Sequence, residues 1–353
     1  MAYRQGEGVV RARAPLRLGL AGGGSDVSPF ADQYGGAVLN ATIDRYATAS
    51  YRPRTDGLVE LVSTDLGERE TLSLAPELPL HSGLKLHRAV YNRMTRDYND
   101  GRPLPMTLLS HVESPMGSGL GSSSALVVAL VTLLAGVLGA PLGEYEIARL
   151  AFDIERKDLG LAGGRQDQYA ATFGGFNFME FAADERVIVN PLRIRQDTIC
   201  ELEASLVLLF TGASRESATI ITDQARSVAS GGKSLEAMLQ LKAEAFEMKE
   251  AVLFGNIDDI AEVLRRGWEA KKSTSGSVSS PEIERIFEAA SRAGALAGKV
   301  SGAGGGGFMM FITQPERRAD VITALEAASG QRPTTARFTA EGTQTWRPIL
   351  RTT

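Results

Sequence analysis

The sequence is poor in the residues that build disulfides and soft-metal sites. Its 353 residues include one cysteine, Cys200, and three histidines. A single cysteine cannot form an internal disulfide framework, which fits a protein of the reducing cytoplasm. A zinc site made of cysteine and histidine ligands is not expected either, because too few such ligands are present.

Excess charge of one sign and long apolar runs are also missing. The net charge is -4 and the basic residues are scattered, so neither a nucleic acid nor an anionic membrane is an expected partner. Residues 1–20 contain polar and charged residues where a secretory signal has its apolar core. The most membrane-like run, Ala125 to Leu142, contains two glycines and a proline and has no flanking Lys or Arg anchor. We expect it to form a buried helix.

The length and the order of elements predict two α+β domains, residues 1–195 and 196–353. Strand patterns are found at residues 36–53, 57–65, 174–181, 204–212, 308–313 and 334–342. Helix patterns are found at residues 84–98, 122–138, 143–160, 233–273 (with a break near Gly255-Asn256), 282–295 and 317–329.

Three different glycine-rich runs punctuate the chain, and the third matches a dinucleotide fingerprint literally. Residues 302–307, "GAGGGG", fit G-x-G-x-x-G. That fingerprint follows a strand and opens a helix, whereas this run is expected to follow a helix and open a strand. A nicotinamide site is therefore not expected.

The middle run, "PMGSGLGSSSA" (residues 115–125), has the context of an anion-binding loop. Its glycines free the backbone to approach a ligand, and Ser122, Ser123 and Ser124 stand where a helix begins. No lysine follows the last glycine, unlike in the usual nucleotide loop. The helix N-terminus and a Mg²⁺ ion held by a serine hydroxyl can supply the positive charge. A serine-capped core helix is the alternative interpretation.

Two acidic residues are candidates for chemistry, and each has an ordinary alternative. Asp167 follows a glycine pair and could accept a proton from an attacking hydroxyl, or simply cap the helix that follows it. Glu155 could be a second metal ligand, or an exposed glutamate on a helix.

The first run, "PLRLGLAGGGSD" (residues 15–26), offers a cation and a carboxylate. Asp26 on a glycine turn suits the capture of sugar hydroxyls, and an Asx-turn is its competitor. Arg17 could approach a transferred phosphoryl group, or pair with Asp167 and keep it ionised.

Together, the three runs in this order resemble the motifs of the GHMP small-molecule kinases. The resemblance implies an N-terminal ribosomal-protein-like β-α domain, a ferredoxin-like C-terminal domain, and ATP in the cleft between them. Within the family, "LAGGGSDVSPF", "IERKDLGLAGGRQDQYAATFGGFNFMEF" and "TGASRES" are most similar to the heptose 7-phosphate kinases.

The resemblance also implies roles for individual residues. Asp167 would be the base with Arg17 beside it, and Ser123 and Glu155 would hold Mg²⁺, although any of the three serines could be the ligand. ATP contacts are implied for Gly117, Ser118, Gly119, Leu120, Gly121, Ser122, Ser123 and Ser124. Substrate contacts are implied for Gly22, Gly23, Gly24, Ser25, Asp26, Gly164, Gln168, Gly302, Ala303, Gly304 and Gly305.

The implied reaction is phosphorylation of the C1 hydroxyl of D-glycero-α-D-manno-heptose 7-phosphate by ATP, for surface-polysaccharide synthesis. The alternatives are a C1 kinase for fucose or mannose, and a non-catalytic regulator that binds ATP and sugar. An acceptor that carries a phosphate needs further cations, and the candidates are Arg165, Arg215, Lys271 and Lys272. We further expect a cytoplasmic enzyme with no membrane and no nucleic acid as partner, for which a homodimer is one possible state.

Overall fold

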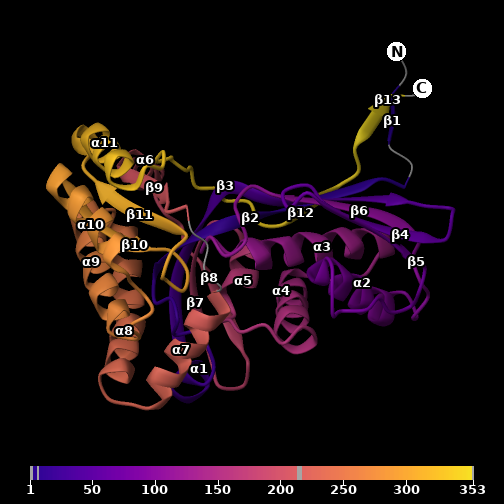
Figure 1. The fold of residues 1–353 in the computed structure, drawn as a ribbon, viewed down its shortest axis with the longest axis horizontal. Coiled ribbons are helices and arrows are strands. Elements are labelled where there is room, and N and C mark those ends of the chain that lie inside the picture. The colour runs from indigo at the N-terminus through magenta and orange to yellow at the C-terminus, as the bar shows by residue number, and fades with distance from the viewer. Residues whose placement is uncertain (1–2, 6–7, 213–216, 352–353) are drawn as a thin grey trace.

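The computed structural model describes residues 3–5, 8–212 and 217–351, which build two packed halves around two main sheets (Figure 1). Helices and strands are present in both halves, which confirms the predicted α+β class. The ends of the chain come together as a small two-stranded sheet of β1 and β13. These two strands are Tyr3–Gln5 and Ile349–Arg351.

The larger sheet has eight strands in the order β12-β2-β3-β6-β4-β5, with β7 beside β3 and β8 beside β7. Only the β4–β6 pair is parallel among the strand pairs of the described residues. The long strand β2 is buried over its second half and ends at Ala21, where the first glycine run begins. The strands are β2 Val10–Ala21, β3 Gly36–Pro53, β4 Leu58–Ser63, β5 Glu68–Ser73, β6 Met106–Val112, β7 Phe176–Phe181, β8 Val187–Pro191 and β12 Gln344–Trp346.

Helices α2 to α5 cover one face of this sheet (Figure 1). The central helix, α3, packs on β2 and β3 and is itself flanked by α2, α4 and α5. A helix that is apolar all round is stable only when it is buried on all sides, and this accounts for the run after Ser122. The predicted buried helix is confirmed, and no helix in the described ranges is both long and apolar enough to span a bilayer. The helices are α1 Phe30–Tyr34, α2 Lys85–Tyr98, α3 Ser122–Leu138, α4 Glu144–Asp153 and α5 Gln166–Phe173.

The second half has a three-stranded antiparallel sheet, β10-β11-β9, covered by helices. The α8–α9 pair links the halves, because α9 lies on β10 while α8 reaches β2 and β3. Asn256 breaks this pair as predicted, and its side chain accepts from the backbone N–H groups of Asp258 and Asp259 at the start of α9. The elements are α6 Gln196–Ser205, β9 Leu206–Phe210, α7 Ser217–Ala229, α8 Lys233–Phe254, α9 Ile257–Lys272, α10 Pro281–Ala293, β10 Ala295–Val300, β11 Phe308–Thr313, a 3₁₀ turn Pro315–Arg317 and α11 Arg318–Ser329.

Three sequence-based expectations are wrong in detail. The third glycine run follows strand β10, not a helix, although it opens a strand as expected. Residues 334–342 form only two isolated bridges, Leu208 to Thr334 and Ile43 to Phe338, so they are not a strand. The helix expected at 143–160 is α only to Asp153 and continues as a π-helical turn, Ile154–Asp158. The division at residues 195 and 196 stays a prediction.

A buried histidine in the first half makes stability depend on pH. His87 on α2 is 2% exposed, and its Nε2 lies 2.7 Å from Ser110 Oγ on β6. Burial lowers the pKa of His87 from 6.5 to about 4, against the opposing charges of Asp65 and Glu70. Between these pH values the unfolded chain binds a proton that the folded chain does not, so stability falls as the pH falls from about 6.5 to about 4.

The contribution of His87 across this range is on the order of 3 kcal/mol. We expect His87→Gln to flatten the dependence of the free energy of unfolding on pH, measured by urea denaturation from pH 7 to pH 4. His81→Gln is the matched control, because His81 is exposed. Parallel curves for the wild type and His87→Gln would contradict the assignment.

Candidate active site

The three glycine runs meet at a cleft of about 640 Å³. Its walls come from the end of β2, the loop before α3, the segment before α5, helices α7 and α9, and the turn after β10. Segments more than 180 positions apart in the sequence therefore lie side by side. Ser301 Oγ, for example, donates to the backbone oxygen of Gly119 at 2.8 Å.

The loop before α3 is shaped to receive an anion. Gly117, Gly119 and Gly121 have φ values of 74°, 84° and 76°, a region that side chains other than glycine rarely adopt. Gly121 is the N-cap of α3 and provides no side-chain cap. Among the described residues, no side chain caps the first backbone N–H groups of α3, and the positive end of the helix dipole points toward the cleft.

The three serines at the start of α3 have different partners. Ser122 Oγ lies 3.1 Å from Ser118 Oγ, and Ser124 Oγ accepts from Gln168 Nε2 at 3.1 Å. Ser123 Oγ donates to Glu155 Oε1 at 3.0 Å, and both residues line the cleft. Of the three hydroxyls, that of Ser123 is thus the one directed to a carboxylate in the cleft.

Glu155 is held in the wall of the cleft by the π-helical turn. It is 1% exposed, so its interpretation as an exposed helix glutamate is wrong. Its second oxygen accepts from Gln168 Nε2, and Arg156 Nη1 lies 3.8 Å from the first. Extra residues inserted into a helix as a π turn often occur at functional sites, since they redirect side chains.

Asp167 and Arg17 form an ion pair at the floor of the cleft. Asp167 Oδ1 lies 2.7 Å from Arg17 Nε and 2.6 Å from Nη2. Arg17 also donates from Nη1 to the backbone oxygen of Gly119, which ties the pair to the loop before α3. Helix α5 begins at Gln166 with Arg165 as its N-cap, so the capping role considered for Asp167 is wrong. Of the two roles considered for Arg17, the structure shows the ion pair with Asp167.

Asp26 lies close by, at the end of the first glycine run. It is 1% exposed, and it accepts from Gln166 N at 3.0 Å, Gln166 Nε2 at 2.9 Å and Gly24 N at 3.2 Å. The bond from Gly24 comes from the residue two positions before Asp26, whereas an Asx-turn accepts from the residue two positions after it, so the Asx-turn is not found among the described residues. A Cβ on Gly164 would lie 1.9 Å from Asp26 Oδ2, which explains the glycine at that position.

The third glycine run lies against the loop before α3. Phe308 N donates to Ser118 O at 2.8 Å, and a Cβ on Gly302 would lie 2.7 Å from Gly119 Cα. Such close backbone contact requires glycine on both sides. The two loops thus form one continuous backbone wall.

Two lysine side chains, Lys271 and Lys299, also line the cleft. Lys271 on α9 donates from Nζ to Gly302 O at 2.7 Å and lies 3.5 Å from Gly23 O. Lys299 on β10 lines the same cleft and is 8% exposed. Burial lowers the pKa of Lys271 to about 8, and Asp26 is the main charge that opposes this effect. Burial also lowers the pKa of Lys299, to about 7.

The predicted site residues divide into those that line the cleft and those behind it. Gln168 is fully buried behind Glu155 and supports it. The others that do not line the cleft are Gly22, Ser25, Ser118, Leu120, Gly304 and Gly305. Those that line it are Arg17, Gly23, Gly24, Asp26, Gly117, Gly119, Gly121, Ser122, Ser123, Ser124, Glu155, Gly164, Asp167, Gly302 and Ala303. Gln166 and Lys299 also line the cleft and were not predicted, although Lys299 stands three residues before Gly302 and Gln166 directly precedes Asp167.

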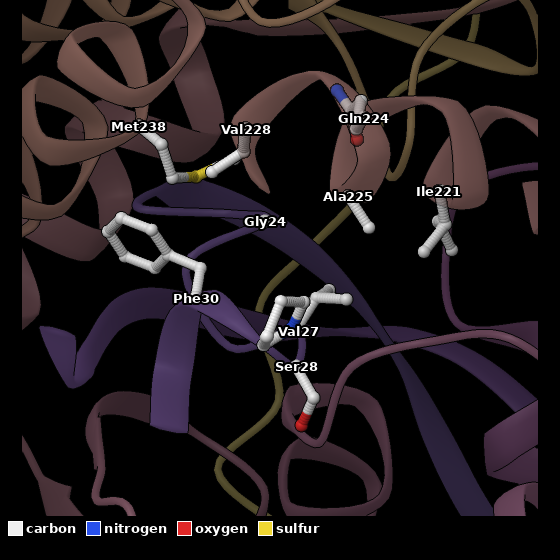
Figure 2. A pocket seen from close by; sticks show the side chains of 10 residues that line it. Gly24, Val27, Ser28, Phe30, Ile221, Gln224, Ala225, Val228 and Met238 are labelled. Atoms are coloured by element: carbon white, nitrogen blue, oxygen red, sulfur yellow. The ribbon is translucent and has the colours of Figure 1, made fainter. Parts of the chain in front are cut away.

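A small apolar pocket borders the cleft beside Asp26. Figure 2 shows Val27 and Phe30, which follow the first glycine run, opposite Ile221, Ala225 and Val228 of α7. Gln224 lines both this pocket and the cleft, and its Nε2 donates to Thr274 Oγ1 at 3.0 Å. Helix α7 therefore forms the wall of the cleft opposite the first glycine run.

The family models of the GHMP kinases match both halves of the chain. The N-terminal domain model matches residues 85–175, and the C-terminal model matches residues 238–330. The first contains the loop before α3, Glu155 and Asp167, and the second contains Lys271, Lys299 and the third glycine run.

Three similar proteins cover nearly all of this chain. The D-glycero-alpha-D-manno-heptose 7-phosphate kinase of Campylobacter jejuni is 45% identical over 96% of this chain and 99% of its own. A crystal structure of a D-glycero-D-manno-heptose 1-phosphate kinase from Bacteroides thetaiotaomicron superposes with a TM-score of 0.82, at 41% identity, over 96% of this chain and 99% of its own. The L-fucokinase/L-fucose-1-P guanylyltransferase of Bacteroides fragilis is 26% identical over 94% of this chain and 37% of its own.

Proposed function

The chain belongs to the GHMP kinase family, and from this premise we propose that it phosphorylates the C1 hydroxyl of D-glycero-α-D-manno-heptose 7-phosphate with ATP. The products would be the 1,7-bisphosphate and ADP. The observation that carries the proposal is the Arg17–Asp167 pair, placed in one cleft with the uncapped start of α3 and with Asp26.

Each part of the cleft has a role in this reaction. The phosphates of ATP would lie against the loop from Gly117 to Ser124, where backbone N–H groups and the helix dipole stabilise negative charge. Asp26 would hold hydroxyls of the sugar. Asp167 would accept the proton of the C1 hydroxyl as that oxygen bonds to the terminal phosphorus and the bond from phosphorus to ADP breaks.

The oxygen ligands in the cleft suit Mg²⁺. Ser123 Oγ and Glu155 Oε1 are hard oxygen ligands 3.0 Å apart, and the described residues contain no group of three or more acidic, histidine or cysteine side chains placed to hold a metal ion. Mg²⁺ is usually held by one or two protein oxygens together with water and substrate phosphates, so this sparse set fits it. We propose that Ser123 and Glu155 hold the ion, which would neutralise charge on the phosphates of ATP.

Arg17 has two tasks in this arrangement. Its guanidinium keeps Asp167 oriented through two short contacts, and it joins the carboxylate to Gly119 in the phosphate loop. The proton acceptor and the phosphate loop are therefore fixed relative to each other, which is what phosphoryl transfer requires of a protein.

An acceptor panel tests the proposal directly. We expect ADP release with Mg·ATP to be fastest with heptose 7-phosphate, compared with free heptose, mannose and fucose. A preference for fucose or mannose would show that the protein is a kinase for another acceptor sugar. ATP binding without ADP release on any acceptor would instead identify a regulator and contradict the proposal.

A further inference from the structure

Lys271 and Lys299 place two amino groups in the cleft, and the described residues supply too few negative partners to favour the charged form of both. Lys271 Nζ contacts only backbone oxygens, Gly302 O and Gly23 O, among the described residues. Lys299 has no hydrogen-bond acceptor or salt-bridge partner in the described part of the chain. A buried ammonium without an acceptor is costly, so this arrangement favours binding of an anion.

The charges around Lys299 strengthen this conclusion. The neighbours that most affect its pKa are Lys271 and Arg17, both of which lower it, and Glu244 is the opposing group. Glu244 itself is buried, burial raises its pKa, and its Oε1 accepts from Gln240. Arg17 is already neutralised by Asp167. Among the described residues, Lys271 and Lys299 therefore have the capacity to bind a further anion.

The free space in front of Lys271 lies on the acceptor side. A Cβ built on Gly23 would lie 3.9 Å from both Lys271 Nζ and Gln166 Nε2, with no closer atom. Gln166 holds Asp26, the residue proposed to bind the sugar. The open volume is thus bounded by Lys271, Gly23 and the Asp26–Gln166 pair.

We propose that Lys271 and Lys299 bind the phosphate that the acceptor itself carries, and so select a sugar phosphate over a free sugar. The inference rests on the proposed function and assigns residues to its substrate preference. An ammonium pair can donate several charge-assisted hydrogen bonds to a phosphate dianion.

The other cations considered from the sequence are already paired or lie elsewhere. Arg165 Nη2 lies 2.7 Å from Asp32 Oδ1, and Lys272 Nζ lies 2.9 Å from Glu269 Oε1. Neither residue lines the cleft, and Arg215 lies outside the described residues.

Lys271→Met and Lys299→Met test the assignment, with Lys272→Met as the matched control on the same helix as Lys271. We expect each cleft variant to raise KM for heptose 7-phosphate by roughly 10- to 100-fold, because a charge-assisted hydrogen bond is lost. KM for ATP and the kcat/KM for free heptose should change little, and Lys272→Met should resemble the wild type. A fall in kcat with unchanged KM for heptose 7-phosphate would overturn the inference, because the lysines would then act on the transferred group.

The unfolding temperature distinguishes a binding role of Lys299 from a structural one. Lys299→Met removes a largely buried amino group that has no acceptor among the described residues, so we expect its unfolding temperature to rise above that of the wild type. A lower unfolding temperature would show that Lys299 stabilises the fold and would overturn the inference.

Gly23→Ala places a methyl group in the open volume in front of Lys271 without removing a charge. Its Cβ meets no atom closer than 3.9 Å in the structure, so we expect the variant to fold and bind ATP normally while KM for heptose 7-phosphate rises. An unchanged KM would place the acceptor phosphate elsewhere. Failure of the proposed function is separate, because it would appear as a wild-type enzyme that releases no ADP with heptose 7-phosphate.

Discussion

Replacing Asp167 by asparagine is expected to lower kcat by roughly 10²- to 10⁴-fold, the usual contribution of a positioned acid or base. An amide of the same shape can still accept a hydrogen bond from Arg17 through its Oδ1, but it cannot take the proton of the attacking hydroxyl. Because the contacts to ATP are proposed for Gly117 to Ser124 and not for Asp167, the affinity for ATP should stay close to that of the wild type.

The control for this variant is another arginine–carboxylate pair far from the cleft. Glu70 accepts from Arg88 Nε at 2.9 Å, and neither residue lines the cleft. Glu70→Gln should keep kcat near the wild-type value even if it lowers stability. Measuring kcat by ADP release and ATP affinity by calorimetry separates the two effects. Near-normal turnover by Asp167→Asn would remove this carboxylate from the mechanism.

Replacing Glu155 by glutamine is expected to lower kcat/KM for Mg·ATP by roughly 10²- to 10³-fold, as when one group that stabilises transition-state charge is lost. The carboxylate is 1% exposed and accepts from Ser123 and Gln168, so an amide would also turn one N–H toward a donor. The Mg²⁺ concentration for half-maximal activity should rise, because a neutral oxygen is a weaker ligand for a hard cation.

Titration of activity with Mg²⁺ measures this effect. Ser123→Ala should shift the titration in the same direction, whereas Ser122→Ala should not, since Ser122 Oγ is turned toward Ser118. Glu146→Gln is the control, because Glu146 is an exposed glutamate on α4, the helix that leads into the Glu155 turn. A Glu155→Gln enzyme with an unchanged Mg²⁺ requirement would contradict the assigned metal site.

Local signals in the sequence predict much of this site. The glycines and serines before Ala125, followed by a run of apolar residues, predict both the loop and the buried helix α3, because each depends on neighbouring residues. Asp167 and Arg17 were recognisable as charges beside glycine turns. Their pairing across 150 positions depends on the packing of α5 against β2, and the sequence left it as one of two alternatives.

Other features depend on long-range packing and could not be predicted in the same way. Glu155 is buried because a π-helical turn redirects it, and no periodicity in "FDIERKDLG" indicates that turn. Residues 334–342 alternate like a strand, but only Thr334 and Phe338 find bridging partners. Lys299 belongs to a strand that the sequence pattern did not reveal, and its closeness to Lys271 on α9 and Arg17 on β2 follows from the packing of the two halves.

In the proposed reaction the oxygen beside Asp167 becomes phosphorylated, and this oxygen is the C1 oxygen of a heptose 7-phosphate. The position of the new phosphate, determined by ³¹P and ¹H NMR of the product, tests this most directly. We predict a second phosphate whose phosphorus couples to the anomeric proton, formed by the wild type and lost in Asp167→Asn. A new phosphate on any other carbon, or the same product from Asp167→Asn at an undiminished rate, would contradict the account.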